Sequence, residues 1–307
     1  MKTCVVLSSY NGEKYILEQL HSISNQIQKV DAVFISDDCS TDNTIKIVRS
    51  YIESNSLSNW HIKRNEINLG WKKNFCNLIL GVPNEYDIIF LCDQDDIWYK
   101  TKTKEMLDCF VNDENLKLLI SDAKIVYQDE TANKLKFKKI FTDNQGYVNI
   151  SPNNTHLKRP GCSFAVKRKF AQECFGTYFH PSFSHDGLLW LYAYGKNSIK
   201  YIKKELFVFR RLASSSTYLN KRENRYLHKK NECLERLELL KTLSNMSDIS
   251  EKAKNMFQNA IKLETLRISF FDSHSFYQWL LCIKYINYYP NVKNWFGDLF
   301  FTMTYKQ

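Results

Sequence analysis

The sequence predicts an α/β fold, with a mostly parallel β-sheet covered by helices on both faces and followed by a C-terminal helical extension. Over about the first 215 residues, short apolar β-prone runs alternate with segments of helical periodicity, which is typical of a parallel sheet with crossover helices. Beyond about residue 216 the sequence is charged and favours helices. We therefore expect an α/β domain over 1–215 and a helical, aromatic-rich region over 216–307.

The N-terminal segment predicts a β-α-β unit. Cys4–Ser8 and Val33–Ser36 are short apolar runs typical of strands. Between them, apolar residues recur at helical spacing: Ile16, Leu17, Leu20 and Ile23. A second helix is predicted over 42–52 with Asp42 as its N-cap, and a strand is predicted near Trp60–Lys63.

Further elements complete the predicted α/β region. A helix is expected over 71–80, and Tyr86–Cys92 is a near-continuous apolar run, as in a strand buried on both faces. Strands over 116–127 and 161–166 and a short helix over 186–194 follow. Ligands of such sheets bind at the carboxyl ends of the strands, so functional residues should come directly after strands.

The composition is that of a globular protein with excess positive charge. The chain has 307 residues, 44% of them hydrophobic, and a formal net charge of +10, which suits an anionic partner such as a pyrophosphate, a nucleic acid or an acidic membrane. None of the nine cysteines forms a C-x-x-C pair. Neither a signal peptide nor an apolar run of membrane-spanning length is recognisable. We expect reduced thiols and a cytoplasmic protein.

An acidic turn is the most specific local feature. Asp93, Asp95 and Asp96 follow the predicted buried strand, with Gln94 between the first two. Three neighbouring carboxylates repel one another, and a divalent cation that prefers hard oxygen ligands, Mg²⁺ or Mn²⁺, would relieve the repulsion. A solvated turn without metal is the structural alternative.

Two other predicted strand ends carry polar residues. Asp37 and Asp38 could accept hydrogen bonds from a nucleobase or a ribose, while Ser40 and Asp42 are better explained as caps of the next helix. At the first strand end, Tyr10 could stack on a base, beside the turn-forming pair at residues 11–12. No glycine-rich phosphate loop of known pattern occurs.

These motifs resemble, in order and separation, those of the family 2 glycosyltransferases. The motifs are Val5-Val6-Leu7-Ser8-Ser9-Tyr10-Asn11, Asp37-Asp38-Cys39-Ser40-Thr41-Asp42, Asn68-Leu69-Gly70 and Asp93-Gln94-Asp95-Asp96, within a similarity that covers about residues 3–212. The resemblance is to bacterial enzymes that build cell-surface polysaccharides. It implies the Rossmann-like GT-A fold, with a nucleotide-sugar half over about 1–100 and an acceptor half over about 101–215.

The resemblance also implies roles for individual residues. Those expected to bind the nucleotide sugar are Ser8, Tyr10, Asn11, Glu13, Asp38, Asn68, Lys73, Asp93, Arg210 and Arg211. Asp95 would bind Mg²⁺ or Mn²⁺ directly together with Asp93, and Asp96 would either support or complete that site. Leu212 stands where the family has a histidine, which leaves a third protein ligand open.

The acceptor side is expected to include Trp98, Gly161, Cys162 and His185. Asp186 would be the base of an inverting transfer, because one carboxylate suffices to take the proton of the attacking hydroxyl. Read from the sequence alone, Asp186 could instead be a helix N-cap. The donor is expected to be linked to dTDP or UDP, and the acceptor to be a saccharide, lipid-linked in our interpretation. The acidic motif resembles that of presumed rhamnosyltransferases.

The C-terminal region leaves more than one interpretation. Leu234, Leu237 and Leu240 are spaced for one helical face. Residues 276–307 are aromatic and include Lys284, Lys293 and Lys306, as in helices that bind peripherally to the inner face of a membrane, but helices packed on the catalytic domain or on a second subunit have the same pattern. A nucleotidyltransferase and a nucleic-acid-binding module are the rival functions. We expect no nucleic acid partner, and a homo-oligomer stays open.

Overall fold

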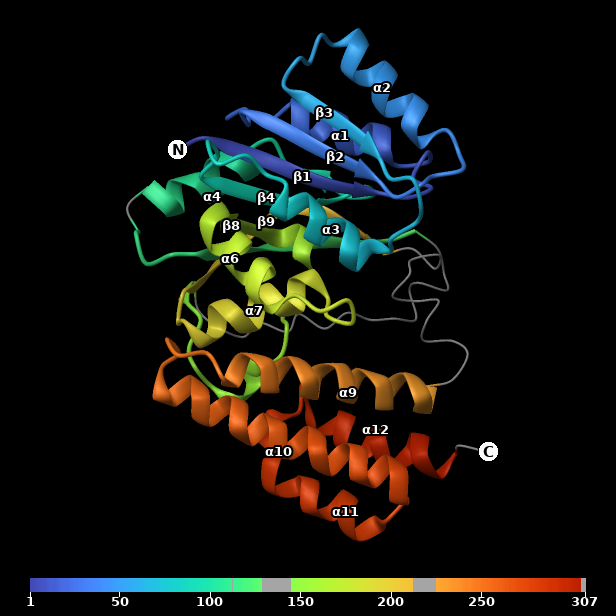
Figure 1. The fold of residues 1–307 in the computed structure, drawn as a ribbon, viewed down its shortest axis with the longest axis vertical. Coiled ribbons are helices and arrows are strands. Elements are labelled where there is room, and N and C mark those ends of the chain that lie inside the picture. Colours follow the sequence, from blue (N-terminus) through green and yellow to red (C-terminus); the bar gives the residue numbers. More distant parts are fainter. Residues whose placement is uncertain (112, 129–144, 212–224, 305–307) are drawn as a thin grey trace.

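The computed structural model describes residues 1–111, 113–128, 145–211 and 225–304. They form a nine-stranded sheet of order β3-β2-β1-β4-β8-β6-β9-β5, with β7 paired to β9 (Figure 1). The strands are β1 (Thr3–Ser9), β2 (Ala32–Asp37), β3 (Trp60–Arg64), β4 (Ile88–Asp93), β5 (Ile97–Trp98), β6 (Leu118–Tyr127), β7 (Gly146–Tyr147), β8 (Phe164–Lys167) and β9 (Ile199–Arg211).

Most strands run in one direction. β1 is parallel to β2 and β4, and β2 is parallel to β3. β8 is antiparallel to both β4 and β6, so β6 and its parallel partner β9 have the direction of β4. Only β5, β7 and β8 are reversed among the strands described. The predicted, mostly parallel α/β sheet is confirmed.

Helices cover both faces of the sheet, because successive side chains of a strand point to opposite faces. Val5 and Leu7 belong to one core cluster, with α1 and α2, whereas Cys4 and Val6 belong to the other, with α3 and α6. The helices of this region are α1 (Ile16–Ser24), α2 (Thr44–Ser54), α3 (Trp71–Leu80), α4 (Lys102–Val111), α6 (Arg168–Tyr178) and α7 (His185–Gly195).

Two predicted elements differ in detail. The second helix begins at Thr44, after Asn43 as its N-cap, so Asp42 is not the cap; the Asp42 carboxylate instead accepts the Thr44 amide at 2.9 Å. The segment predicted as a strand over 161–166 starts with a 3₁₀ turn, η2 (Gly161–Ser163), and only then enters β8. The turn matters because it carries residues of the candidate site.

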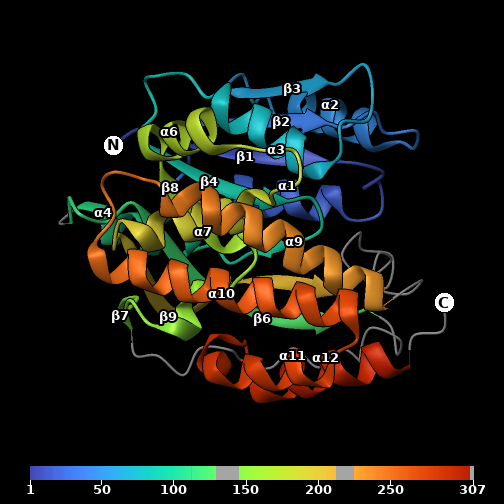
Figure 2. The same cartoon turned by 60° about the horizontal axis from the view of Figure 1, so that its bottom comes forward.

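The C-terminal helices form a further layer at the end of the molecule opposite β3 (Figure 2). They are α9 (Arg225–Ser244), α10 (Glu251–Ser273), α11 (Phe276–Leu281), η3 (Cys282–Tyr288) and α12 (Val292–Met303). Their buried side chains belong to the same core cluster as α7 and one sheet face. The expected domain boundary near residue 216 lies outside the described residues.

The buried stripe of α9 differs from the predicted one. Leu240 is buried as expected, but Leu234 is 43% exposed, and the stripe contains Cys233 and Leu243 instead. None of the described helices is both long and apolar enough to cross a bilayer.

A buried ion network joins the C-terminal helices to one another. Arg267 of α10 donates to both carboxylate oxygens of Asp298 on α12, at 2.8 and 3.0 Å, and to Glu264 at 3.0 Å. Glu264 also accepts a bond from Arg236 of α9 at 2.8 Å. Because both acids are at most 1% exposed, each depends on these arginines to stay charged inside the protein.

Candidate active site

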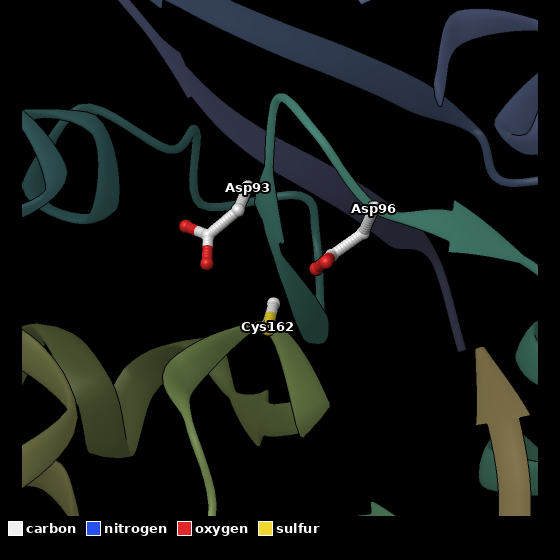
Figure 3. A group of neighbouring side chains, drawn as sticks. All are labelled: Asp93, Asp96 and Cys162. Atoms are coloured by element: carbon white, nitrogen blue, oxygen red, sulfur yellow. The ribbon is translucent and has the colours of Figure 1, made fainter. Parts of the chain in front are cut away.

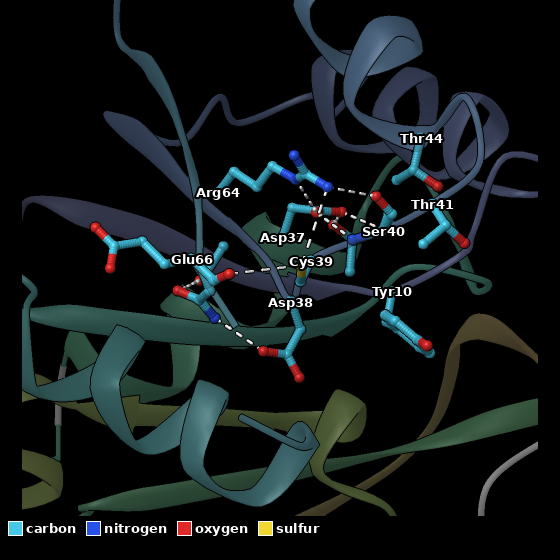
Figure 4. Close-up of polar contacts among 12 residues, drawn as sticks. Tyr10, Asp37, Asp38, Cys39, Ser40, Thr41, Thr44, Arg64 and Glu66 are labelled. Carbon is cyan, nitrogen blue, oxygen red and sulfur yellow. Dashed lines mark hydrogen bonds and ion pairs between the residues drawn. The ribbon is translucent and has the colours of Figure 1, made fainter. Parts of the chain in front are cut away.

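The loops after β1 and β2 are tied together at the carboxyl edge of the sheet, and Figure 4 shows further contacts of the loop after β2 with Arg64 and Glu66. Asn11, at φ 46°, accepts the Thr41 amide through its side chain at 2.9 Å and donates its own amide to Ser40 at 2.9 Å. Glu13 accepts bonds from the backbone and side-chain nitrogens of Asn43, both at 2.9 Å. Asn11 and Glu13, predicted to bind the donor, therefore already support the shape of this edge.

The acidic pair after β2 has structural partners. Asp37 accepts the Ser40 amide at 2.8 Å and its hydroxyl at 2.5 Å, so Ser40 is not the helix cap that the sequence suggested. Asp38 is 2% exposed and accepts the amides of Leu69 and Gly70, both at 2.8 Å. Asp38 thereby holds the start of α3 against the edge where a nucleoside is expected.

An asparagine that the sequence analysis did not single out connects three strand ends. Asn74 of α3 is fully buried, donates to Ser8 at 2.7 Å and to the Ser36 carbonyl at 3.0 Å, and accepts bonds from Ser36 and Asn65. The amide therefore fixes the predicted donor residue Ser8 relative to β2 and β3. Its only sequence signal is a polar residue on the apolar face of a predicted helix.

Gln94 connects the acidic turn to the first loop. Its side-chain oxygen accepts the Tyr10 amide and its nitrogen donates to the Tyr10 carbonyl, both at 2.9 Å. Gly12 leaves the space for this contact, since a Cβ there would lie 2.2 Å from the Gln94 oxygen. The backbone of Tyr10 is thus fixed, while its side chain is 47% exposed at the edge and available for stacking.

Acidic side chains from the turn after β4 meet η2 at the centre of the site (Figure 3). One ligand atom each of Asp93, Asp96 and Cys162 lies within 4.8 Å of the others. Apart from the Cys162 thiol, the carboxylate oxygens of Asp96 have no hydrogen-bond partner among the described residues, although the residue is fully buried. Asp95 follows Asp93 by two residues but is not part of this group.

Burial and mutual repulsion shape the titration of the acids. Burial, followed by the charge of Asp95, raises the pKa of Asp93 to about 7. Burial also raises the pKa of Asp95, and burial with the charge of Asp93 raises the pKa of Asp96 well above its usual range. A bound cation would reverse these shifts, because it favours the charged carboxylates.

The donor set fits a hard divalent cation through its carboxylates. Burial raises the pKa of the Cys162 thiol far above neutrality, so its sulfur is a protonated, soft and unsuitable ligand for Mg²⁺ or Mn²⁺. Lys102 lies beneath the cluster, donates to the Cys162 carbonyl at 2.7 Å, and has its pKa lowered to about 8 by burial. Lys102 supports the turn from below and was not found from the sequence.

Asp186 faces this cluster from the start of α7. The N-cap of α7 is Ser184, whose hydroxyl accepts the Gly187 amide at 3.2 Å, so Asp186 is not the cap. Asp186 is partly exposed, and its charge contributes to the raised pKa of Asp93. A partly exposed carboxylate beside the acidic turn can take a proton from a hydroxyl bound between them.

His185 precedes Asp186 in the chain and is almost completely buried. It is 4% exposed, its ring stacks on Phe75 with centroids 4.1 Å apart, and neither ring nitrogen has a hydrogen-bond partner within the described chain. Burial lowers its pKa. Gly161 lies against it, because a Cβ on Gly161 would be 2.4 Å from His185 Nε2. Gly161 and His185 therefore set the position of the η2–α7 contact.

The remaining predicted residues lie around this centre. Arg210 is 8% exposed, pairs with Glu18 of α1, and opposes the rise in the pKa of Asp95. Arg211 lies over the ring of Phe209 at 5.0 Å. Lys73 and Asn68 are exposed at the edge.

Trp98 is only 3% exposed and packs in the core, which does not support the predicted direct contact with an acceptor. Leu212 lies outside the described residues.

Replacing Gly161 with alanine is expected to lower the transfer rate about 100-fold, since the new methyl group would displace His185 and with it Asp186. Initial rates with saturating donor measure this effect. Gly176→Ala on α6 is the matched control, because a Cβ there meets no atom within 4 Å. Equal rates for the two variants would show that the η2–α7 contact does not position the site.

The mostly parallel sheet with an acidic turn at its carboxyl edge, together with the family model that the chain matches, identifies this protein as a glycosyltransferase. The description Glycosyl transferase family 2 belongs to the family model that matches residues 4–175, more than half of the chain. The chain is a member of that family, as its motifs indicated.

Known relatives agree with this assignment. The dTDP-rhamnosyl transferase RfbG of Shigella flexneri is 35% identical over 165 residues, 53% of this chain and 54% of the relative. The poly(ribitol-phosphate) beta-N-acetylglucosaminyltransferase TarS of Staphylococcus aureus is 33% identical over 126 residues, 40% of this chain and 21% of the relative. The matches thus span about half or less of these relatives' own length.

Solved structures share the fold. A structure of S. aureus TarS residues 1–349 in complex with UDP-GlcNAc has a TM-score of 0.66 at 18% identity, over 97% of this chain and 82% of that one. The mannosyltransferase PcManGT of Pyrobaculum calidifontis, in complex with GDP-Man and Mn²⁺, has a TM-score of 0.59 at 13% identity, over 98% and 85%. At such identities the likeness concerns the fold.

Proposed function

We propose that this protein is a metal-dependent, inverting glycosyltransferase that moves a sugar from a nucleotide diphosphate donor to a saccharide acceptor. The observation that carries the proposal is the meeting of Asp93, Asp95 and Asp96 with Asp186 at one edge of the sheet, where burial and repulsion raise the pKa of Asp93 to about 7. Such a site is suited to a divalent cation and an anionic donor.

The roles of the chain's own residues follow from their positions. Tyr10 offers an exposed ring on a fixed backbone for the base, and Ser8 is held at the end of β1 by Asn74. Asp93 would hold Mg²⁺ or Mn²⁺ together with Asp95, the ligand that the family motif implies, while Asp96, which lies within 4.8 Å of Asp93, would support or complete the site. The bound cation would stabilise the charge of the departing nucleotide diphosphate. Arg210 adds positive charge near Asp95.

Asp186 would act as the base. Its carboxylate takes the proton of the acceptor hydroxyl as that oxygen bonds to the anomeric carbon, and the bond from this carbon to the phosphate oxygen breaks on the opposite side. A single displacement inverts the configuration and needs no carboxylate nucleophile. This division of roles agrees with one partly exposed carboxylate outside the acidic turn.

We extend the proposal to the substrates and the compartment. The similarity to RfbG favours a dTDP-linked donor carrying rhamnose, and UDP is the second candidate base. A lipid-linked saccharide is the proposed acceptor, within bacterial surface polysaccharide synthesis. All nine cysteines are unpaired, which suits the reducing cytoplasm.

Calorimetric binding of UDP, dTDP, GDP and ADP, each with and without Mn²⁺, tests the proposal. One nucleotide is expected to bind in a metal-dependent manner, and Asp95→Asn should weaken this binding at least about tenfold because a charged ligand is lost. Asp108→Asn is the matched control, since Asp108 is an exposed acid of α4 paired with Lys104. Absence of binding by all four nucleotides would contradict the proposed function.

A further inference from the structure

Three short helical segments, α11, η3 and α12, expose an unusual amount of apolar surface. On α11 and η3 the exposed side chains are Phe276, Tyr277, Leu280 and Ile283, and on α12 they are Val292, Phe296, Phe300 and Met303, each between 41% and 76% exposed. Their spacing of three or four residues places those of α12 along one side of the helix. We call these eight side chains the C-terminal apolar face.

The C-terminal apolar face rests on a rigid support. The rings of Trp279 and Trp295 stack with centroids 4.1 Å apart, and each indole nitrogen donates to the backbone carbonyl of the other tryptophan, at 2.9 and 3.1 Å. Asp298 of α12 is held by Arg267 of α10. The exposed side chains therefore belong to helices whose inner sides are packed and whose buried polar groups have partners. Their outward position is part of the fold.

The exposed charges within α11, η3 and α12 have one sign. In residues 276–304 the exposed charged side chains are Lys284 and Lys293. The one acid of this segment, Asp298, is 1% exposed and paired with Arg267. Apolar side chains in a segment whose exposed charges are lysines complement an anionic lipid surface, in which the rings enter the boundary of the acyl chains and the ammonium groups stay among the headgroups.

We propose that the C-terminal apolar face binds peripherally to an anionic membrane, with α11 and α12 lying along the bilayer surface. A second copy of the chain is a less suitable occupant, because a two-fold contact through this face would bring the lysines of both copies together without an exposed acid from the same segment. The helices α11 and α12 lie at the end of the molecule opposite β3 (Figure 2), so binding there leaves the carboxyl edge of β1, β2 and β4 uncovered. The inference is independent of which sugar is transferred.

Flotation of the full chain with vesicles of phosphatidylcholine plus phosphatidylglycerol, and of phosphatidylcholine alone, tests the inference. The protein is expected to float with the anionic vesicles. Ile283→Glu combined with Phe300→Glu should lower the partition coefficient about tenfold or more, because two apolar anchors become charged. Lys284→Glu combined with Lys293→Glu should lower it about fivefold for each lysine on the anionic vesicles only.

The matched control is Ile27→Glu combined with Val111→Glu, two side chains that are 63% and 64% exposed outside the C-terminal helices. Circular dichroism and urea unfolding confirm that each variant is folded. The inference is overturned if the folded wild-type protein ignores anionic vesicles, or if the control weakens binding as much as the test pair. It is equally overturned if light scattering shows a dimer that Phe300→Glu dissociates while vesicles are not bound.

Discussion

Asp186→Asn is expected to lower the transfer rate about 10²- to 10⁴-fold while donor affinity stays within a few-fold of the wild type. The amide oxygen of asparagine can still accept the Gly187 amide, as the Asp186 carboxylate does at 2.8 Å, so α7 should begin at the same place. What is lost is the group that takes the proton. Single-turnover rates and calorimetric donor binding on the same preparations separate the two quantities.

Ser184→Ala provides the control for Asp186→Asn. This change removes the hydroxyl that caps α7 and should cost about 1 kcal/mol of stability with a much smaller effect on transfer. A transfer rate of Asp186→Asn within a few-fold of the wild type would exclude Asp186 as the base. Loss of donor binding in the same variant would assign the residue to the donor site instead.

Arg267→Ala is expected to lower the free energy of unfolding by about 3–5 kcal/mol. The change would leave Asp298 and Glu264 buried, charged and without the guanidinium that lies 2.8–3.0 Å from their oxygens. Since these residues join α10 to α12, the C-terminal layer should unfold first. Urea unfolding followed by far-ultraviolet circular dichroism measures the effect.

Lys254→Ala is the matched control for Arg267→Ala, because Lys254 makes a 3.9 Å pair with Glu251 on the exposed side of the same helix. Such surface pairs contribute about 0–1 kcal/mol. If both variants lost equally little stability, the buried network would not hold the C-terminal helices together.

The acidic turn shows which features of the site can be predicted from a local sequence pattern. A continuous apolar run predicts the buried strand β4, and the three acids that follow it indicate a cation site because like charges repel wherever they gather. The sequence could not show which acids meet. Asp93 lies within 4.8 Å of Asp96 and of the Cys162 thiol of a distant segment, while Asp95 is not in that group, because the turn geometry after β4 orients each carboxylate separately.

The roles of the residues that position the site could not be predicted from the sequence, because their partners are far away in the chain. Gln94 binds the backbone of Tyr10, and Lys102 donates to the Cys162 carbonyl. Each such contact joins segments at least 60 residues apart. An amide or a lysine has no periodic pattern that would reveal such a partner, so only its spatial neighbour identifies its role.

The sequence by itself determined the alternation of strands and helices, the placement of polar residues after β1, β2 and β4, and the family motifs, because apolar periodicity and strand-end chemistry are local properties. Tertiary structure alone decided that Asp42 does not cap α2, that Trp98 is in the core, and that the C-terminal helices pack together yet keep an apolar face outside. Those outcomes depend on which surfaces are buried against each other, and burial is a property of the assembled fold.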